Sequence, residues 1–135
     1  KADFSGGTAM YTWKDLETIV AKLRSEDGCP WDREQTHESL KSCLQNECQE
    51  VMEAIDKGDM ANLCEELGDL LFNIVLQCRI GEEEGVFTMA EVINGASEKM
   101  IRRHPFVFEE KKTLSPQESQ ALWKEIKLQE KSKKP

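Results

Sequence analysis

The sequence lacks an apolar run long enough to cross a membrane, and its first residues lack the apolar core of a secretory signal peptide. Aromatic residues make up only 7%, and the 8 glycines and 4 prolines lie mostly between periodic segments. No stretch shows the sustained alternation of a strand, and no internal repeat is evident. In 135 residues, of which 33% are charged, these absences predict one all-α domain of a soluble protein without membrane partners.

Basic residues and metal-binding cysteine or histidine motifs are also scarce. The 18 lysines and arginines face 26 acidic residues, and the net charge of −8 repels polyanions, so nucleic acid is not expected as a partner. The five cysteines are odd in number and form no Cys-x-x-Cys motif, which predicts reduced thiols in a cytoplasmic protein. His37 and His104 lack ligand spacing and are interpreted as structural.

Hydrophobic periodicity and capping residues predict five helices, at about 12–24, 38–56, 59–84, 88–103 and 116–129. Only Gly58-Asp59 and their neighbours join the second helix to the third, so these two should be antiparallel neighbours in a helix bundle. The domain is predicted to span residues 11–130. Residues 1–10 are interpreted as a linker, an expression remnant or the end of a preceding domain, and 131–135 as a frayed tail.

The two central helices carry regularly spaced carboxylates. Glu47 falls on the apolar stripe of the second helix with Glu50 one turn on, and Glu66 and Asp69 repeat this step in the third. The run 67–75 is apolar almost all round, which predicts a buried helix. Because both pairs lie at similar distances from the turn, the four carboxylates should converge. Raised pKa values or a bound cation would relieve their repulsion, and oxygen ligands suit Mg²⁺ or Mn²⁺. The alternative is a solvated acidic face.

Two further segments suggest ligand contacts. The stretch Cys29-Pro30-Trp31-Asp32-Arg33-Glu34-Gln35-Thr36-His37 is predicted to be a polar loop, in which Trp31 either pins the loop to the core or stacks on a nucleobase or sugar. Lys99, Arg102 and Arg103 end the fourth helix, where the helix dipole favours cations. In so acidic a chain, this cluster is also the best candidate for binding an anion.

With these segments assembled, the chain resembles the MazG-like family of nucleoside triphosphate pyrophosphohydrolases over roughly residues 11–130. The resemblance rests on four motifs: Cys29–His37, Glu47-x-x-Glu50, Glu66–Phe72 and Ile101-Arg102-Arg103-His104-Pro105. It implies an all-α homodimer or higher homo-oligomer with four helices around each site. It also implies Mg²⁺-dependent cleavage of NTPs and dNTPs between the α and β phosphates, yielding the monophosphate and pyrophosphate, as a nucleotide-pool house-cleaning enzyme.

The resemblance also implies residue roles. Glu47, Glu50, Glu66 and Asp69 match the family's metal-binding carboxylates. Lys99 and Arg103 match its phosphate-contacting Lys-x-x-x-Arg, and Trp123 and Lys127 match a substrate-side Trp-x-x-x-Lys. The chemistry of the residues agrees, because metal-assisted phosphoryl transfer needs charge neutralisation and a proton acceptor, for which Glu50 or Glu47 is suited.

One position departs from the family pattern. Asn46 stands where relatives commonly carry the first of two consecutive glutamates, and an amide can neither accept a proton from water nor add negative charge for a second ion. The alternative hypothesis is therefore a catalytically weak or silent interaction or regulatory module. A di-iron bundle is a third reading, disfavoured because such a site needs Glu-x-x-His steps that this chain lacks.

Overall fold

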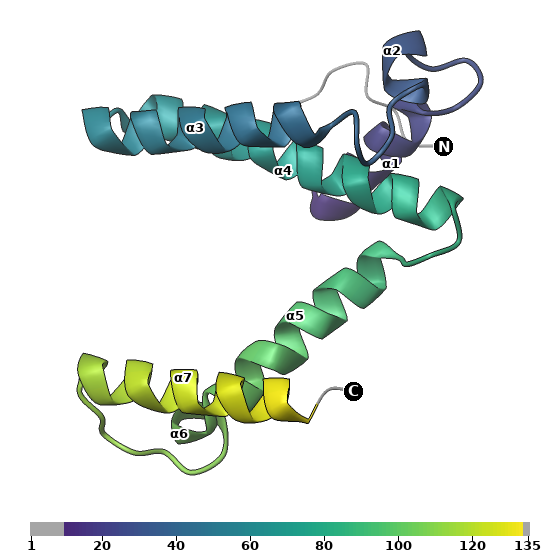
Figure 1. Ribbon diagram of the computed structural model, residues 1–135. Helices are drawn as coiled ribbons and strands as arrows, with labels where there is room; N and C mark the ends of the chain where they lie inside the picture. Colours follow the sequence, from purple (N-terminus) through teal and green to yellow (C-terminus); the bar gives the residue numbers. More distant parts are fainter. Residues whose placement is uncertain (1–9, 134–135) are drawn as a thin grey trace. The chain divides into compact units, whose positions relative to one another are not determined.

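The computed structural model describes residues 10–133 and contains only helices in that range (Figure 1), which confirms the predicted all-α class. The helices are α1 (Trp13–Leu23), α2 (Pro30–Arg33), α3 (Lys41–Lys57), α4 (Met60–Glu83), α5 (Met89–Arg103), α6 (Pro105–Phe108) and α7 (Pro116–Ser132). The chain divides into two compact units, residues 1–89 and 90–135. Residues 1–9 of the expected linker and 134–135 of the expected tail lie outside the described residues.

The five long helices occupy the predicted places, and two short helices were not predicted. α2 lies within the segment 29–37, so the prediction of a loop there is wrong for four residues. α6 follows His104 directly. Both begin with proline, whose fixed φ angle suits the first position of a helix. Periodicity over such short segments carries no signal, which is why the sequence did not reveal them.

The helix ends follow from local side-chain chemistry, as predicted. Thr12 and Ser115 each form a reciprocal capping box with the residue three positions on. The side chain of Asp59 accepts a hydrogen bond from the backbone N–H of Asn62 at the start of α4. Gly58 ends α3 in the left-handed conformation, with φ of 66°. The short turn between α3 and α4 is therefore determined by its own residues.

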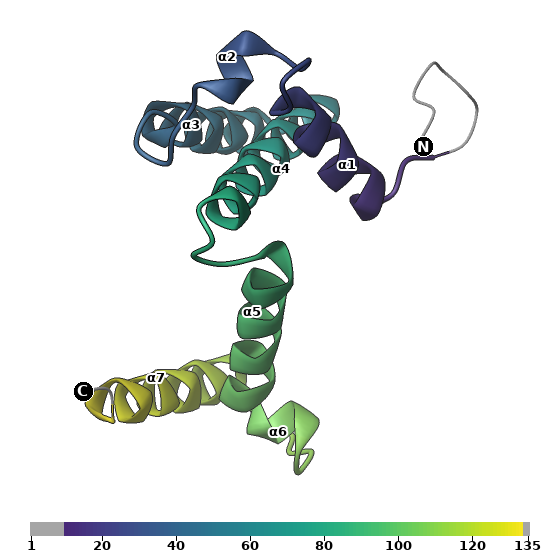
Figure 2. The same ribbon diagram turned by 90° about the vertical axis from the view of Figure 1, so that its right-hand side faces the viewer.

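The core of unit 1 lies where α1, the start of α3 and the C-terminal half of α4 meet (Figures 1 and 2). Val20, Leu40 and Leu76 are fully buried, and each contributes roughly 1.5–3 kcal/mol by leaving water. Further along, α3 and α4 lie side by side as antiparallel neighbours. There Leu67 is 48% and Ile74 40% exposed, so the prediction that 67–75 is buried all round is wrong.

Unit 2 contains α5 from Ala90 onward, α6 and α7. Its α5 and α7 are joined by side-chain ion pairs rather than by a large apolar core, since none of the described residues of α6 or α7 is fully buried. Across residues 10–133, no helix is both long enough and apolar enough to cross a membrane.

Candidate functional site

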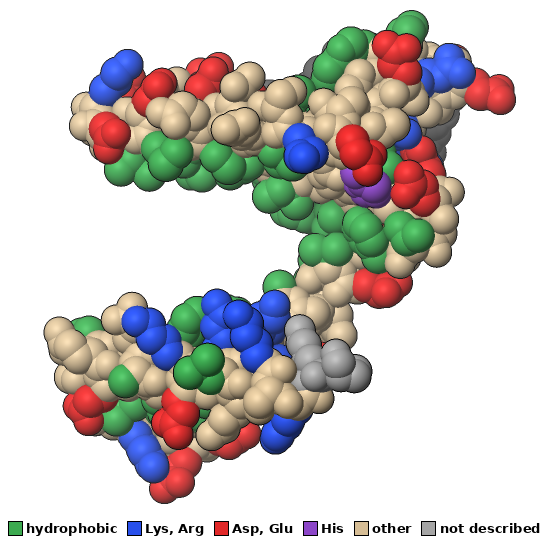
Figure 3. Space-filling view, in the orientation of Figure 1, with side chains coloured by type: hydrophobic (Ala, Val, Ile, Leu, Met, Phe, Trp, Pro, Cys, Tyr) green, Lys and Arg blue, Asp and Glu red, His purple; other side chains and the backbone are tan. Residues whose placement is uncertain are grey.

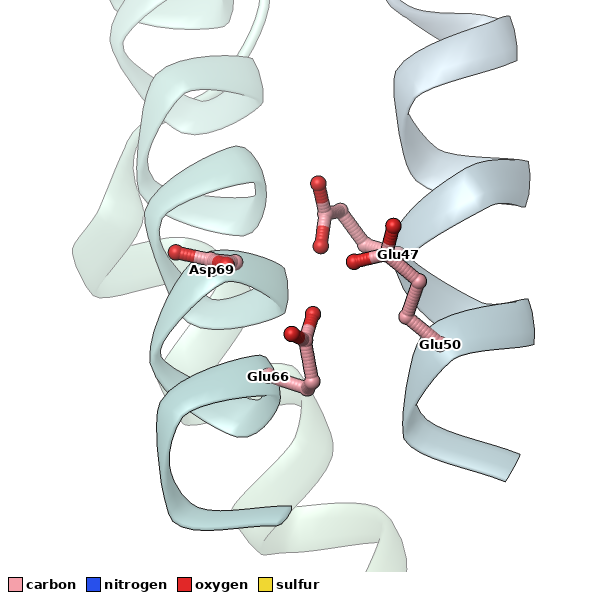
Figure 4. Close-up of side chains that lie close together, drawn as sticks. All are labelled: Glu47, Glu50, Glu66 and Asp69. Atoms are coloured by element: carbon pink, nitrogen blue, oxygen red, sulfur yellow. The ribbon is translucent and has the colours of Figure 1, made fainter. Parts of the chain in front are cut away.

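Four carboxylates converge between α3 and α4 (Figure 4). Glu47 and Glu50 extend from α3, and Glu66 and Asp69 from α4, with one oxygen of each lying within 4.8 Å of the others. The spacing of three residues in each helix and the short turn between them bring the pairs level. This convergence confirms the geometric prediction made from the sequence, and the cluster is tighter than the ~6 Å separation at which each like-charge pair already costs roughly 3 kcal/mol.

The cluster is electrostatically unsatisfied. Oε2 of Glu47 and Oε2 of Glu66 are both buried without a hydrogen-bond partner. A hydrogen bond with Glu50 raises the pKa of Glu66 to about 7, and burial and repulsion from the other three carboxylates act in the same direction. Burial raises the pKa of Glu47, and repulsion from Glu50 and Asp69 adds to it. The four carboxylates therefore favour uptake of a proton or a cation.

The donor set fits a hard divalent cation. The four residues all offer carboxylate oxygens, which Mg²⁺ and Mn²⁺ prefer, and two of the residues, Glu47 and Glu66, each have a buried oxygen without a hydrogen-bond partner. Among residues 10–133, no lysine or arginine forms an ion pair with any of these four carboxylates. The charge of the cluster is thus left for an external ion to balance.

A pocket of about 210 Å³ adjoins the carboxylates in unit 1. Trp31 lines it and is 51% exposed, so the ring is available to a ligand instead of being buried as an anchor. The structure thus brings Trp31 together with two of the predicted metal ligands. The complete lining is Trp31, Leu40, Cys43, Glu47, Asp69, Phe72, Asn73 and Leu76.

Arg24 holds the segment that carries Trp31. Its guanidinium side chain is only 8% exposed, donates to the backbone carbonyls of Asp32 and Gln35, and pairs with Glu83 at 2.8 Å. The loop is therefore tied to α1 and α4 by Arg24. Sequence reasoning missed this residue, because an arginine at the end of an exposed helix has no distinctive spacing and its partner Glu83 lies 59 residues away.

The cationic residues expected to bind substrate gather in unit 2 (Figure 3). Lys99, Arg103 and Lys127 line one pocket of about 630 Å³ between α5 and α7. The guanidinium carbon of Arg103 lies 5.6 Å from the ring centroid of Trp123, and Nζ of Lys127 lies 5.0 Å from it, both within cation–π range. The pocket, here called the basic pocket, is lined by Lys99, Arg102, Arg103, Lys127, Glu130, Lys131 and Lys133.

Glu130 is the acidic member of the basic pocket, and sequence reasoning missed it. Its carboxylate accepts from Nε of Arg102 at 2.7 Å and pairs with Nη2 of Arg103 at 3.1 Å. The hydrogen bond from Arg102 lowers the pKa of Glu130 to about 2, with Arg103 adding to the effect. One carboxylate thus orients two guanidinium groups, and the six cations of the pocket retain a strong positive excess.

Comparison with known proteins places these features in a family context. The family model described as "MazG nucleotide pyrophosphohydrolase domain" matches residues 35–108. The chain is 49% identical over 122 residues to the "Nucleoside triphosphate pyrophosphohydrolase/pyrophosphatase MazG" of Thermotoga maritima, covering 90% of this chain and 46% of that protein. It is 40% identical over 120 residues to the "Nucleoside triphosphate pyrophosphohydrolase" of Escherichia coli K12, covering 88% of this chain and 46% of that protein.

A solved structure agrees with these matches. The crystal structure of a mazG-related protein from Thermotoga maritima superimposes with a TM-score of 0.69 at 35% identity, covering 84% of this chain and 96% of that one. The chain spans no more than about half the length of the curated relatives it matches.

Proposed function

We propose that this chain, which belongs to the MazG nucleotide pyrophosphohydrolase family, hydrolyses nucleoside triphosphates and their deoxy forms between the α and β phosphates. The products are a nucleoside monophosphate and pyrophosphate, and the role is removal of unwanted nucleotides from the cytoplasmic pool. The observation that carries this proposal is the convergence of four carboxylates, with two buried oxygens that have no partner in the protein.

Glu47, Glu50, Glu66 and Asp69 would hold Mg²⁺, with Mn²⁺ as a substitute. A bound divalent ion supplies charge neutralisation on phosphate oxygens and a lowered pKa for a coordinated water. The orphaned oxygens of Glu47 and Glu66 support this assignment, since a cation would give each of them the partner it lacks.

Glu50 or Glu47 takes the proton from the attacking water. Glu47 is suited to this task because burial raises its pKa, which makes its carboxylate a stronger base at neutral pH. Glu50 is exposed and hydrogen-bonded with Glu66, so a proton received there can be shared within the cluster. Asn46, exposed on α3 beside Glu47, cannot serve as a base.

Lys99, Arg103 and Lys127 bind the phosphate chain and the leaving pyrophosphate. They supply cations from one pocket, and arginine adds the planar fork that matches phosphate oxygens. Trp123 contacts two of the three, which holds their charged groups in place. Trp31 stacks on the nucleobase from its half-exposed position.

We also propose a homodimer or higher homo-oligomer. Apolar side chains are exposed on both α3 and α4: Met52 is 51%, Ile55 55%, Met60 58% and Leu67 48% exposed. Figure 3 shows hydrophobic side chains gathered along the edge of this helix pair. Contiguous apolar surface of this kind is typical of protein interfaces. Sedimentation equilibrium should give at least twice the monomer mass, and a monomer at micromolar concentration would refute this part of the proposal.

The deciding experiment is release of pyrophosphate from a panel of NTPs and dNTPs with Mg²⁺, with Mn²⁺ and with a chelator. Metal-dependent release with an equal amount of monophosphate is the expected result. Release of inorganic phosphate and a diphosphate would instead place cleavage between the β and γ phosphates and refute the proposed bond.

A silent interaction or regulatory module is the second candidate, and Asn46 is the observation that favours it. In this case the protein would bind Mg²⁺, seen as a rise in melting temperature, yet release no pyrophosphate from any nucleotide. Restoring the family's acid with Asn46→Glu separates the two ideas. Activity gained by this substitution would attribute the silence to Asn46, whereas a variant that stays inactive would point to a binding role.

A further inference from the structure

Asn73 is a buried polar residue in the pocket beside the carboxylates. It lies on α4, one turn beyond Asp69, and is only 7% exposed. Its neighbours in the pocket wall include Leu40, Phe72 and Leu76, all apolar. A buried amide in apolar surroundings costs free energy unless its hydrogen bonds are made, so the hydrogen bonds open to Asn73 influence what can occupy the pocket.

The pocket suits the base of a nucleotide better than its phosphates. Its volume of about 210 Å³ is below the roughly 300–1,000 Å³ of pockets that enclose a drug-sized ligand, so it can hold one part of a nucleotide. Its two carboxylates, Glu47 and Asp69, belong to the proposed metal site, so metal-bound phosphates would lie at that end of the pocket and the rest of the lining is left for another part of the nucleotide. Its aromatic and aliphatic walls, with Trp31 half exposed at the edge, match a planar ring.

The amide of Asn73 is oriented by the helix on which it lies. Its Nδ2 donates to the backbone carbonyl of Asp69 at 2.9 Å. One N–H is thereby used, while the amide retains its second N–H and the two lone pairs of Oδ1. The bond to the backbone restrains the amide, so Oδ1 has a restricted range of positions from which to meet a ligand.

We propose that Asn73 determines base specificity: its Oδ1 accepts a hydrogen bond from an N–H on the edge of a nucleobase that packs against Trp31. This inference rests on the proposed function, because it takes a nucleotide as the ligand. A base with no N–H at that position would cover Oδ1 without giving it a donor. The kcat/KM for a nucleotide with that base should therefore be roughly 5- to 150-fold lower than for the preferred base.

The test compares wild type with Asn73→Leu, which keeps the approximate volume and removes the hydrogen bond, and with Asn73→Gln, which keeps the amide one methylene further out. The matched control is Asn94→Leu, at an exposed position on α5. Each protein, checked for folding by circular dichroism, is assayed for kcat/KM on the four NTPs and four dNTPs. Calorimetry with the corresponding monophosphates and Mg²⁺ measures base preference without turnover.

Wild type and Asn94→Leu should discriminate between best and worst bases by at least about fivefold. In Asn73→Leu, the kcat/KM for the best base should be no more than about twice that for the worst base. Inhibition by inorganic pyrophosphate should stay within twofold of wild type. If Asn73→Leu does not fold, Asn73→Gln decides the matter by changing the order of preference. The inference is overturned if folded Asn73→Leu or Asn73→Gln keeps the base preference of wild type. It is also overturned if wild type shows no base preference. Monophosphate binding that follows this pattern without hydrolysis supports Asn73 while refuting the proposed reaction.

Discussion

Two helix pairs in this protein gather charges of opposite sign, and they differ in whether a residue of the protein supplies a counter-charge. Between α3 and α4, four carboxylates gather, none of them in an ion pair with a basic residue of the described chain, and the pKa of Glu66 rises to about 7. Between α5 and α7, six cations line one pocket, and one carboxylate pairs with two of them, with the pKa of Glu130 falling to about 2. The first cluster is short of counter-charge, and the second carries an internal one.

This difference indicates what each surface requires from a ligand. The carboxylate cluster gains free energy from any suitable cation, because binding removes repulsion and satisfies two buried oxygens. The basic pocket is already ordered by Glu130 before an anion arrives, so its arginines lose less conformational freedom on binding. The acidic site should therefore respond strongly to metal, and the basic pocket chiefly to the phosphate charge of the substrate.

The largest expected effect is on turnover at the acidic cluster. Glu50→Gln removes a proposed proton acceptor and metal ligand, and kcat for the preferred NTP should fall roughly 10²- to 10⁴-fold. The matched control is Glu53→Gln, on the same helix but outside the cluster, where the side chain accepts a hydrogen bond from Gln49. Steady-state pyrophosphate release measures both variants. If kcat falls equally in Glu50→Gln and Glu53→Gln, the loss of any negative charge on α3 would explain the result, and a specific role of Glu50 would be contradicted.

A smaller effect is expected in the basic pocket. Lys99→Ala removes one phosphate partner, and KM for the preferred NTP should rise roughly 10- to 150-fold, as expected for a hydrogen bond to a charged group. Lys124→Ala serves as the control, since Lys124 is exposed on α7 and does not line the pocket. Raising the salt concentration should narrow the difference between the two variants. An unchanged KM in Lys99→Ala would remove this residue from the phosphate site.

Asp69→Asn tests the stored repulsion directly. Without metal, the variant should be more stable than wild type by roughly 1–2 kcal/mol. Asp69 is exposed, so water screens its repulsion: a like-charge pair at ~4 Å costs about 1 kcal/mol in water, less than the roughly 3 kcal/mol that a pair costs at an effective dielectric of ~20. The increase in melting temperature that Mg²⁺ gives wild type should be lost. Thermal melts with Mg²⁺ and with chelator check both statements. A less stable apo variant that still responds to Mg²⁺ would contradict the comparison.

The smallest effects are those of pH, and the two helix pairs should respond in opposite directions. The folded pKa of Glu66 is raised from 4.5 to about 7, so the folded state binds more protons between these values and stability falls as pH rises through this window. The folded pKa of Glu130 is lowered to about 2, so its contribution is present above about pH 4.5 and is lost as pH falls towards 2.

Urea titrations of Glu66→Gln and Glu130→Gln across pH 3–8 measure these contributions. The Glu66 variant should lose the decline in stability between pH 4.5 and 7, and the Glu130 variant should lose part of the decline below pH 4.5. Saturating Mg²⁺ should abolish the first effect and leave the second unchanged. If the free energy of unfolding of Glu66→Gln depends on pH as that of wild type does, the raised pKa belongs to another carboxylate of the cluster and not to Glu66.

Much of the fold was predictable because helix limits depend on neighbouring residues. The caps at Thr12, Asp59 and Ser115 and the stop at Gly58 involve partners at most five residues away, which periodicity and composition reveal. The one-turn helices α2 and α6 escaped prediction because four residues are too few to show a period. The exposure of Leu67 was also missed, since an apolar run does not say which of its faces finds a partner.

The candidate site divides along the same line. The carboxylate pairs and the grouping of Lys99 with Arg103 were predictable from spacings of three and four residues within single helices. Arg24 and Glu130 were not, because their partners lie 59 and 27–28 residues away. Asn73 was not singled out either, since an asparagine in a helix is usually exposed and only the packing of Leu40, Phe72 and Leu76 makes it a pocket residue.

The sequence by itself determined that this protein is helical, that α3 and α4 turn back on each other, and that four carboxylates meet between them. Each of these depends on interactions within a few turns of helix or on one short connection. Only the tertiary structure decided which carboxylate oxygens lose their contact with water, which arginines share Glu130, and what surrounds Trp31 and Asn73. Those properties arise from burial and from pairs distant in sequence, and both exist only once the helices have packed.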